Sequence, residues 1–435
     1  MASPSPGSAA PQPLHIEARL LPSVTFRNSN ANQLSVLICK WLHKNFQTLL
    51  VEDSITSFGD SEVLSKSVDQ LFVSEIVHST VQVVRLKDVQ LHVHVYQLHE
   101  NKASEAARAR GVPSGACRIL DLPAQSLEGL WDSLMFEPGL KSKLLGFVSS
   151  LSFFADKKVN FMNIGFNRII LLHGPPGTGK TSFARALAQK LSIRLSNRYS
   201  ECQLMEINSH NLFSKYFSES ATLVGQLFDK IDALLVDSDL FLVILIDEVE
   251  TLIPSRQTAL NANDPTDGLR VVNAILTGLD KLRSKANVIV LTTSNLIHSL
   301  DPAFLDRADI KQFVDTPSTA AAYSILRNGL QELVRVGIIT EKEILPCSTE
   351  ASLNLFRLPD ASSTRLWNCA SKCVGFSGRE LGKMLILMHA LHLQQTQYSF
   401  REALNALEKT VEEKVQEKRQ PKVNGGDSKQ MEGSG

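Results

Sequence analysis

The sequence contains no apolar stretch long enough to cross a membrane, which takes about 20 consecutive apolar residues. Its first residues, MASPSPGSAAPQP, also lack the basic segment and the following apolar run that make up a secretory signal. We therefore expect neither membrane insertion nor secretion, and we place the protein in the cytosol or the nucleus.

An excess of charge of either sign is also lacking. Lys plus Arg and Asp plus Glu number 45 each, so the formal net charge is zero. A protein that holds nucleic acid through its bulk charge carries a basic excess. The composition argues against that class of protein and leaves only a local basic patch for such binding.

The six cysteines are scattered, and only Cys369 and Cys373 lie close together. Without a second pair they do not complete a set of zinc ligands, so free thiols in a reducing compartment are favoured. His92 and His94 share one face of an expected strand. With only His99 nearby, packing or solvated histidines are favoured over a metal site.

The chain has 435 residues, of which 43% are hydrophobic and 21% charged. This balance is typical of a soluble globular protein with two or three structural units. Residues 1–13 are rich in Pro, Ser and Ala, so we expect disorder there. Strand-like alternation in LHVHVYQL and the helical pattern of NQLSVLICKWLHKNF predict a small α+β domain over residues 14–100.

A polar linker is expected at residues 101–120, and the pattern then changes to buried strands alternating with helices. Such alternation implies a parallel sheet with crossover helices, here over residues 121–317. A helical region follows at 318–410 and is expected to form a separate small domain. The charged residues 411–435 are expected to form a disordered tail.

The strongest motif is GPPGTGKT, which follows an apolar strand and opens an Ala- and Leu-rich helix. This spacing is that of a phosphate-binding loop. Glycines allow the tight backbone wrap that points N–H groups at phosphate oxygens, and the helix N-terminus adds its dipole. Lys180 can reach the β- and γ-phosphates, and the Thr181 hydroxyl can hold Mg²⁺. The predicted ATP-binding residues are Gly174, Pro175, Pro176, Gly177, Thr178, Gly179, Lys180, Thr181 and Ser182.

A second motif, LFLVILIDEVE, is a buried strand that ends in Asp247 and Glu248. A carboxylate pair at such a place is costly unless it has cationic or hydrogen-bonded partners. Beside a phosphate loop, Asp247 is expected to hold Mg²⁺ through water and Glu248 to polarise the attacking water. An ordinary strand end with solvated acids is the plainer interpretation, and the first motif weakens it.

A third buried strand, VIVLTTSNL, ends in a polar cluster with Asn295 at its tip. Ligands of open α/β sheets bind at the carboxyl ends of the strands, so Asn295 can reach the γ-phosphate or the attacking water. Taken alone, Asn295 fits a turn-forming residue equally well.

Together with DPAFLDRAD, these motifs resemble the AAA+ ATPase module. The chain is more closely similar to the pachytene checkpoint protein 2 family, whose animal members are called thyroid receptor-interacting protein 13. SKYFSES and DRADIKQ carry this closer resemblance, which covers roughly residues 121–390. It implies a P-loop AAA+ module, with a doubly wound parallel sheet and a small α-helical lid. A small α+β N-terminal domain that binds substrate or adaptor would precede this module.

The resemblance assigns two arginines to catalysis. Arg307, in LDRAD, stands where the family's arginine finger would act on ATP bound by the neighbouring subunit. Asp309 stands near the position of a second arginine in the general AAA+ spelling. Arg379, in FSGRE, stands where the second sensor of the lid reaches the γ-phosphate. From the sequence alone, a surface salt bridge is the simpler role for either arginine.

The resemblance also implies that loops face the centre of a ring. Tyr216 and Phe217 stand in the first pore loop, where an aromatic can grip an extended peptide; family members often carry Trp in place of Tyr216. The polar stretch Gln257–Gly268 is similar to a second pore loop, with Asp267 and Arg270 at its exit. Residues Gly129–Ser133 stand where adenine would be contacted.

The implied assembly is a homo-hexamer that uses ATP and Mg²⁺ to unfold part of a bound protein through its pore. The family's substrates are HORMA-domain proteins of the spindle checkpoint and the meiotic chromosome axis, presented by a comet-type adaptor. No direct nucleic acid and no membrane are expected as partners. The expected location is the nucleus and cytoplasm, with chromosomes or kinetochores as further sites.

Two other classes stay open. A nucleic-acid-directed AAA+ protein would show salt-dependent DNA affinity, and zero net charge and an aromatic pore loop argue against it. A nucleotide-locked scaffold would bind partners but hardly turn over ATP. The intact Lys180, Asp247, Glu248 and Asn295 argue against that second class.

Overall fold

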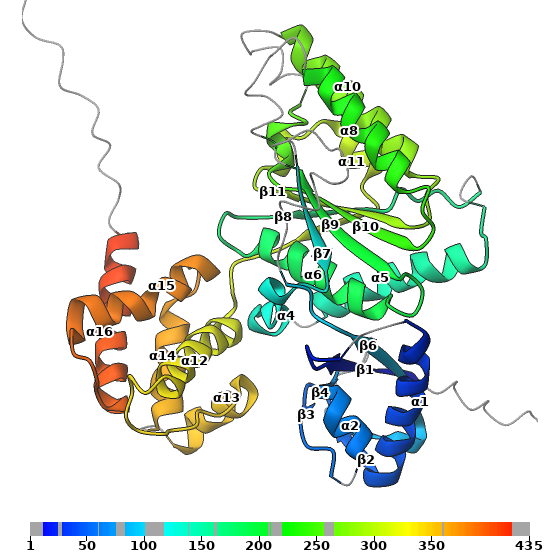
Figure 1. Ribbon diagram of the computed structural model, residues 1–435. Helices are drawn as coiled ribbons and strands as arrows, with labels where there is room; N and C mark the ends of the chain where they lie inside the picture. The colour runs from blue at the N-terminus through cyan, green and yellow to red at the C-terminus, as the bar shows by residue number, and fades with distance from the viewer. Residues whose placement is uncertain are drawn as a thin grey trace, which may run out of the picture. The chain divides into compact units, whose positions relative to one another are not determined.

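Figure 1 shows the computed structural model of the chain, which divides into two compact units, Met1–Asp315 and Thr316–Gly435. None of the helices in the described part of the chain is both long and apolar enough to cross a membrane. The structure describes residues 12–24, 28–59, 61–74, 83–100, 117–137, 139–160, 163–207, 209, 220–255, 265–358 and 361–419.

In its described residues, the N-terminal domain contains a sheet with the strand order β3-β4-β1-β6, a β2–β5 pair, two α-helices and a 3-10 helix (Leu86–Asp88). Alternate residues of β1, such as Ile16 and Ala18, are buried in one apolar core, as a period of two requires. β1 begins at Gln12, where it pairs with β6, so the expected disorder over 1–13 is wrong for its last two residues. The elements are β1 (Gln12–Leu20), α1 (Asn28–Asn45), β2 (Thr48–Leu50), β3 (Ser54–Ile55), α2 (Glu62–Ser67), β4 (Val68–Val73), β5 (Val83–Arg85) and β6 (Val89–Tyr96).

The central sheet has the strand order β12-β8-β11-β10-β9-β7 among the described residues. All neighbours pair in parallel except β7, which runs antiparallel to β9 at the edge. The expected linker 101–120 is therefore wrong for residues 117–120, because Ile119 and Leu120 of β7 are buried on opposite faces of the sheet. The strands are β7 (Cys117–Leu122), β8 (Ile169–His173), β9 (Glu201–Ile207), β10 (Leu240–Ile246), β11 (Val288–Ser294) and β12 (Ile310–Phe313).

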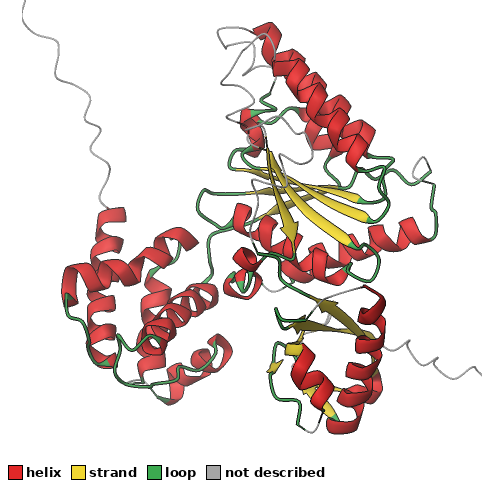
Figure 2. Ribbon diagram, in the orientation of Figure 1, coloured by secondary structure: helices red, strands yellow, loops and turns green. Residues whose placement is uncertain are grey.

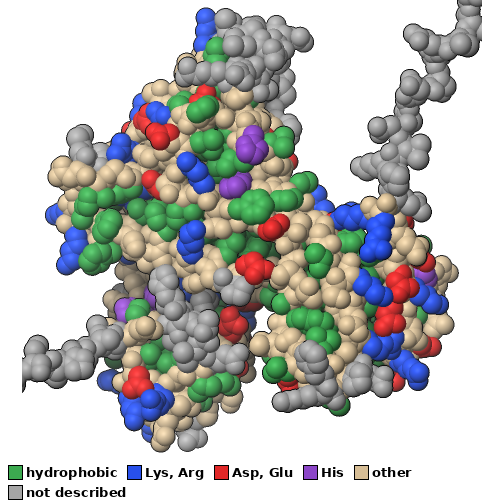
Figure 3. Space-filling view, turned by 180° about the vertical axis from the view of Figure 1, so that it is seen from behind, with side chains coloured by type: hydrophobic (Ala, Val, Ile, Leu, Met, Phe, Trp, Pro, Cys, Tyr) green, Lys and Arg blue, Asp and Glu red, His purple; other side chains and the backbone are tan. Residues whose placement is uncertain are grey.

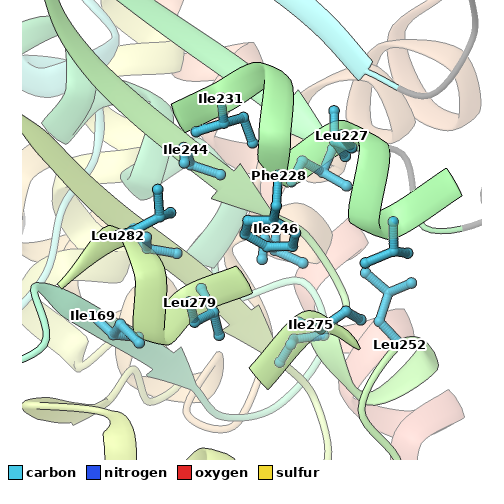
Figure 4. Close-up of a cluster of buried hydrophobic side chains, with 14 of the residues drawn as sticks. Ile169, Leu227, Phe228, Ile231, Ile244, Ile246, Leu252, Ile275, Leu279 and Leu282 are labelled. Atoms are coloured by element: carbon cyan, nitrogen blue, oxygen red, sulfur yellow. The ribbon is translucent and has the colours of Figure 1, made fainter. Parts of the chain in front are cut away.

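Helices cover both faces of this sheet, as Figure 1 shows: α8 and α10 on one, α5 and α6 on the other. Successive residues of β10 alternate between the two cores, so Ile244 packs with Ile231 of α8 (Figure 4) while Val243 faces α6. Both faces are buried, which explains the continuous apolar strands of the sequence. The helices are α4 (Leu130–Ser133), α5 (Leu140–Asp156), α6 (Lys180–Arg194), α8 (Ser220–Leu234), α10 (Pro265–Leu282) and α11 (Pro302–Arg307).

The second unit is helical (Figure 2) and has its own core. Val411 is fully buried in that core, so the last helix continues through Arg419, and the expected disorder over 411–435 is wrong for residues 411–419. Basic and acidic side chains mix on its surface (Figure 3), for example in the Lys372–Glu412 pair. The helices are α12 (Thr319–Arg335), α13 (Ser348–Arg357), α14 (Ser362–Lys372), α15 (Gly378–Met388), a π-helix (His389–Leu393) and α16 (Phe400–Arg419).

Candidate active site

Strand order brings the three motifs together. β11 lies between β8, which leads into the phosphate loop, and β10, which leads into Asp247. The register pairs Ser294 with His173 and Thr292 with Ile246, so the three strands end at one edge of the sheet. Parallel strands present their carboxyl ends together, which is where ligands of such sheets bind.

The phosphate loop wraps around the Lys180 side chain. The Lys180 ammonium donates hydrogen bonds to the carbonyl oxygens of Gly174 at 2.8 Å and Pro175 at 2.7 Å. Burial lowers the pKa of Lys180, and the carboxylates of Glu250, Asp247 and Glu248 oppose that shift. The loop therefore holds a cation between its own carbonyls and a group of acids, where phosphate oxygens would be its natural partners.

Glycine is required at the start of this loop. Gly174 has a φ of +146°, and its N–H donates to the carbonyl of Ser294 at 3.3 Å. A Cβ at this position would lie 2.2 Å from the carbonyl oxygen of Val314. The close approach of the loop to the end of β12 thus leaves no room for any side chain.

Asp247 accepts hydrogen bonds on one oxygen from two threonines. The Thr181 hydroxyl donates to Asp247 Oδ1 at 2.7 Å, and the Thr293 hydroxyl donates to the same oxygen. A hydroxyl and a carboxylate side by side are the hard oxygen donors that Mg²⁺ prefers. Thr181 and Asp247 therefore fit a magnesium ion, which would neutralise phosphate charge when bound with ATP.

Glu248 directly follows Asp247 and is exposed. Its φ of +51° is left-handed, a strained conformation for a residue with a side chain. The Glu248 N–H donates to the Thr293 hydroxyl at 3.1 Å, which fixes the backbone at this turn. An exposed carboxylate on a constrained backbone, next to the proposed magnesium ligand, is suited to polarise a water molecule.

Asn295 follows β11 directly and is half-buried. Its N–H donates to Glu250 Oε1 at 2.9 Å, so a residue of the second motif holds the backbone of the third. The contacts of Thr293 and Glu250 were missed from the sequence, although TTSN and DEVE contain both residues. Spacing along the chain gives no sign of hydrogen bonds that link two different strands.

The expected adenine-contacting residues, Gly129–Ser133, form the start and body of α4. Within them, Trp131 is buried against Phe183 of α6, with ring centroids 5.8 Å apart. The apolar side chains of Leu134 and Phe136 lie beside Gly179 of the phosphate loop, 3.6 Å and 3.8 Å from where a Cβ at that position would stand. These two residues, not predicted from the sequence, are suited to contact the base or sugar of a nucleotide.

Family models match three successive parts of the chain. They are described as the TRIP13 N-terminal domain, the ATPase family associated with various cellular activities (AAA), and the TRIP13-like AAA+ ATPase lid C-terminal domain. The matched residues are 9–101, 170–316 and 318–415, respectively.

Curated relatives cover most of the chain. The pachytene checkpoint protein 2 homolog of Danio rerio is 42% identical over 82% of this chain and 84% of its own length. The Homo sapiens homolog is 39% identical over 93% of this chain and 94% of its own. This chain belongs to the pachytene checkpoint protein 2 family. It is an AAA ATPase and binds nucleotide, as the resemblance predicted.

Solved structures agree with this assignment. The structure of C. elegans PCH-2 matches with a TM-score of 0.73 and 30% identity, and the match covers 93% of this chain and 100% of that one. A chain of the E. coli MS115-1 HORMA:CdnC:Trip13 complex matches with a TM-score of 0.53 and 18% identity, over 67% of this chain and 94% of that one. The second likeness shows a shared fold. The predicted fold class is confirmed.

In this family member, Arg307 ends α11 and pairs within its own chain. Its guanidinium donates two hydrogen bonds to the Asp280 carboxylate, both at 2.8 Å, and a third to the carbonyl of Ala303 at 2.8 Å. The Arg307 hydrogen bond lowers the pKa of Asp280. Asp309 accepts the backbone N–H groups of Asn167 and Ile169, which explains an acid at this position: it ties β12 to the start of β8. The finger role of Arg307 stays a prediction.

Arg379 is the second residue of α15 in the other compact unit and is exposed. Ser377 and Glu380 form a capping box around it, and Lys418 donates to the carbonyl of Gly375 at 2.8 Å, so this helix start is well fixed. Its expected contact with ATP stays a prediction.

The predicted pore-loop aromatics, Tyr216 and Phe217, lie outside the described residues. So does most of the second expected pore loop, Gln257–Gly268, whose last residues begin α10 at Pro265. Arg270 lies on α10 and is exposed, and Asp267 belongs to its first turn. The pore-loop assignments therefore stay predictions.

Proposed function

We propose that this AAA ATPase works as a homo-hexameric motor that partially unfolds HORMA-domain proteins by drawing them through a central pore. The observation that carries the motor is the meeting of Lys180, Asp247, Glu248 and Asn295 at one sheet edge, with Thr181 bonded to Asp247. This arrangement supports a role for one of these residues in each part of ATP hydrolysis: phosphate binding, magnesium binding, water activation and γ-phosphate sensing.

Family membership supports the choice of substrate. The chain matches the family along its N-terminal domain, ATPase module and lid, so it has the parts of its relatives in the same order. A solved bacterial chain of the same fold is described in a complex with a HORMA protein. HORMA-domain proteins, presented by a comet-type adaptor, are therefore the partners we propose.

The proposed setting is control of the spindle checkpoint and the meiotic chromosome axis, in the nucleus and cytoplasm and at chromosomes or kinetochores. Within the hexamer, Arg307 would act on ATP of the neighbouring subunit, and Arg379 would reach the γ-phosphate as the second sensor. Tyr216 and Phe217 would grip the substrate chain by apolar contact, which is independent of the substrate's sequence.

The test compares ATP hydrolysis by wild type and Glu248→Gln, with and without a purified HORMA-domain protein and its adaptor. Oligomeric mass in ATP is measured in parallel. We expect substrate to stimulate wild type, and the variant to be silent while it assembles a ring that traps substrate. Partner binding with no hydrolysis above the variant would instead support a nucleotide-locked scaffold. Stimulation by DNA, lost as salt rises, would support a nucleic-acid-directed ATPase.

A further inference from the structure

Glu250 is a charged residue of the site to which phosphate binding, magnesium binding and water activation give no role. It lies in the 3-10 helix Val249–Thr251, two residues after Glu248, and is half-buried. Its Oε1 accepts the N–H of Asn295 at 2.9 Å. The Glu250 side chain, which follows the end of β10, thus holds the backbone that follows the end of β11.

The other carboxylate oxygen of Glu250 is buried and has no hydrogen-bond partner among the described residues. Leaving a buried acceptor unpaired costs free energy. A glutamate that served only to accept one N–H group would therefore destabilise the fold through its unpaired oxygen. The negative charge of Glu250 acts on Lys180. Among the acids that raise the pKa of Lys180, Glu250 has the largest effect.

Its hydrogen bond falls at a sensitive place. Asn295 is the first residue after β11, and the preceding Ser294 is tied to the phosphate loop because its carbonyl accepts the N–H of Gly174 at 3.3 Å. On the other side, Thr293 bonds to Asp247 and Glu248. These hydrogen bonds fix the end of β11 up to Ser294. The Glu250 hydrogen bond fixes one residue more, the backbone of Asn295, which carries the side-chain amide.

We propose that Glu250 is a positioning residue for ATP hydrolysis, which acts by fixing the backbone of Asn295 so that its side-chain amide is held at the reacting phosphate. This inference rests on the ATPase function and on the sensing role proposed for Asn295. Loss of the hydrogen bond should lower kcat and leave nucleotide affinity nearly unchanged, because Asn295 would contribute in the transition state more than in the ground state.

Two variants of the same size separate the hydrogen bond from the charge. Glu250→Gln keeps an acceptor for the Asn295 N–H, and Glu250→Met fills the same space without one. Both remove the charge near Lys180, so a difference between them reports the hydrogen bond alone. We expect kcat of Glu250→Met to be about tenfold below that of Glu250→Gln, with KM and the affinity for a fluorescent ATP analogue within about twofold.

The Asn295→Ala background gives the decisive comparison. If Glu250 acts through Asn295, exchanging Gln for Met at position 250 changes kcat by less than about twofold once the amide is gone. Thermal midpoints of all variants are compared, because a merely structural role would lower the midpoint of Glu250→Met without a change in kcat that depends on the Asn295 amide. Should Glu250→Met fail to fold, Glu250→Ala replaces it.

Equal kcat values for Glu250→Gln and Glu250→Met would overturn the proposal, as would an undiminished effect in the Asn295→Ala background. Failure of the underlying function looks different: wild type would then hydrolyse no ATP above Glu248→Gln. An active wild type with no difference between the two variants rejects only the role of Glu250.

Discussion

Lys190 of α6 and Glu17 of β1 form an ion pair between the ATPase module and the N-terminal domain. The Lys190 nitrogen lies 2.8 Å from Glu17 Oε1, and both side chains are only 5% exposed. The same ammonium lies 5.1 Å from the ring centre of Phe72. Because α6 begins at Lys180 in the phosphate loop, about 15 Å of rigid helix separates the nucleotide site from this contact.

We expect Lys190→Met to destabilise the protein by about 3 kcal/mol, because the Glu17 carboxylate would stay buried without its counter-charge. The double variant Lys190→Met/Glu17→Leu removes both charges and should recover most of the loss. Thermal unfolding of the wild type, both single variants and the double variant measures the coupling.

Lys281→Met is the matched control. Its partner Asp229 is 2.8 Å away, but both side chains are more than half exposed, so little change is expected. If the destabilisations caused by the single substitutions at positions 17 and 190 add up to that of the double variant, the ion pair contributes no coupling energy to stability.

A second prediction concerns the stability of the N-terminal domain at low pH. His15 Nδ1 and His94 Nε2 lie 2.9 Å apart, and burial lowers the pKa of His15 to about 2 and of His94 to about 3. The neighbouring Arg194, His92 and Lys190 add to burial in producing these low values. Unfolded histidine titrates near a pKa of about 6.5, so below that pH only the unfolded chain binds these protons. The full contribution to stability is present well above pH 6.5 and is lost as the pH falls, by roughly 3 kcal/mol for the two histidines together at pH 5.5.

Urea unfolding at several pH values between 7.5 and 5.5 measures this slope. The double variant His15→Gln/His94→Gln should flatten it, whereas His43→Gln, at an exposed position of α1, should leave it unchanged. An unchanged slope in the double variant would assign the acid sensitivity to other groups.

The sequence predicted the nucleotide site because each strand is an unbroken apolar run that stops at a polar group, and this pattern is local. It missed β7, since CRILDL is short and follows a polar stretch. It ended the last helix too early, because only Val411 and Val415 are apolar within residues 411–419. The contacts of Glu250 with Asn295 and of Lys190 with Glu17 join residues far apart in sequence, so no spacing rule indicates them.

A third prediction follows from the crowding at Gly174. Gly174→Ala would place a methyl group 2.2 Å from a backbone oxygen that has little freedom to move, so the phosphate loop must shift. We expect ATP affinity to fall by about tenfold or more. Gly225→Ala on α8 is the control, because nothing lies within 4 Å of the added carbon. Binding of a fluorescent ATP analogue distinguishes the two, and unchanged affinity in Gly174→Ala would mean that the loop adapts.

The last prediction asks whether Arg307 acts on ATP or only on Asp280. Asp280→Ala breaks the two hydrogen bonds at 2.8 Å but leaves the guanidinium free to act elsewhere. If Arg307 is the finger, Arg307→Ala should lower kcat by about 100-fold or more, and Asp280→Ala should leave it within about threefold.

Mixing two kinds of variant subunit tests the finger role directly, because an arginine finger acts on ATP bound by the neighbouring subunit. Arg307→Ala subunits keep their own phosphate loop, and Lys180→Ala subunits keep their arginine. Each is inactive alone, but a mixed ring would contain sites with an intact loop on one subunit and an intact arginine on the next. Recovered hydrolysis on mixing requires an arginine that acts across subunits. If mixing restores nothing, and both Arg307→Ala and Asp280→Ala lower the thermal midpoint equally without changing kcat, the pair only anchors α11 to α10.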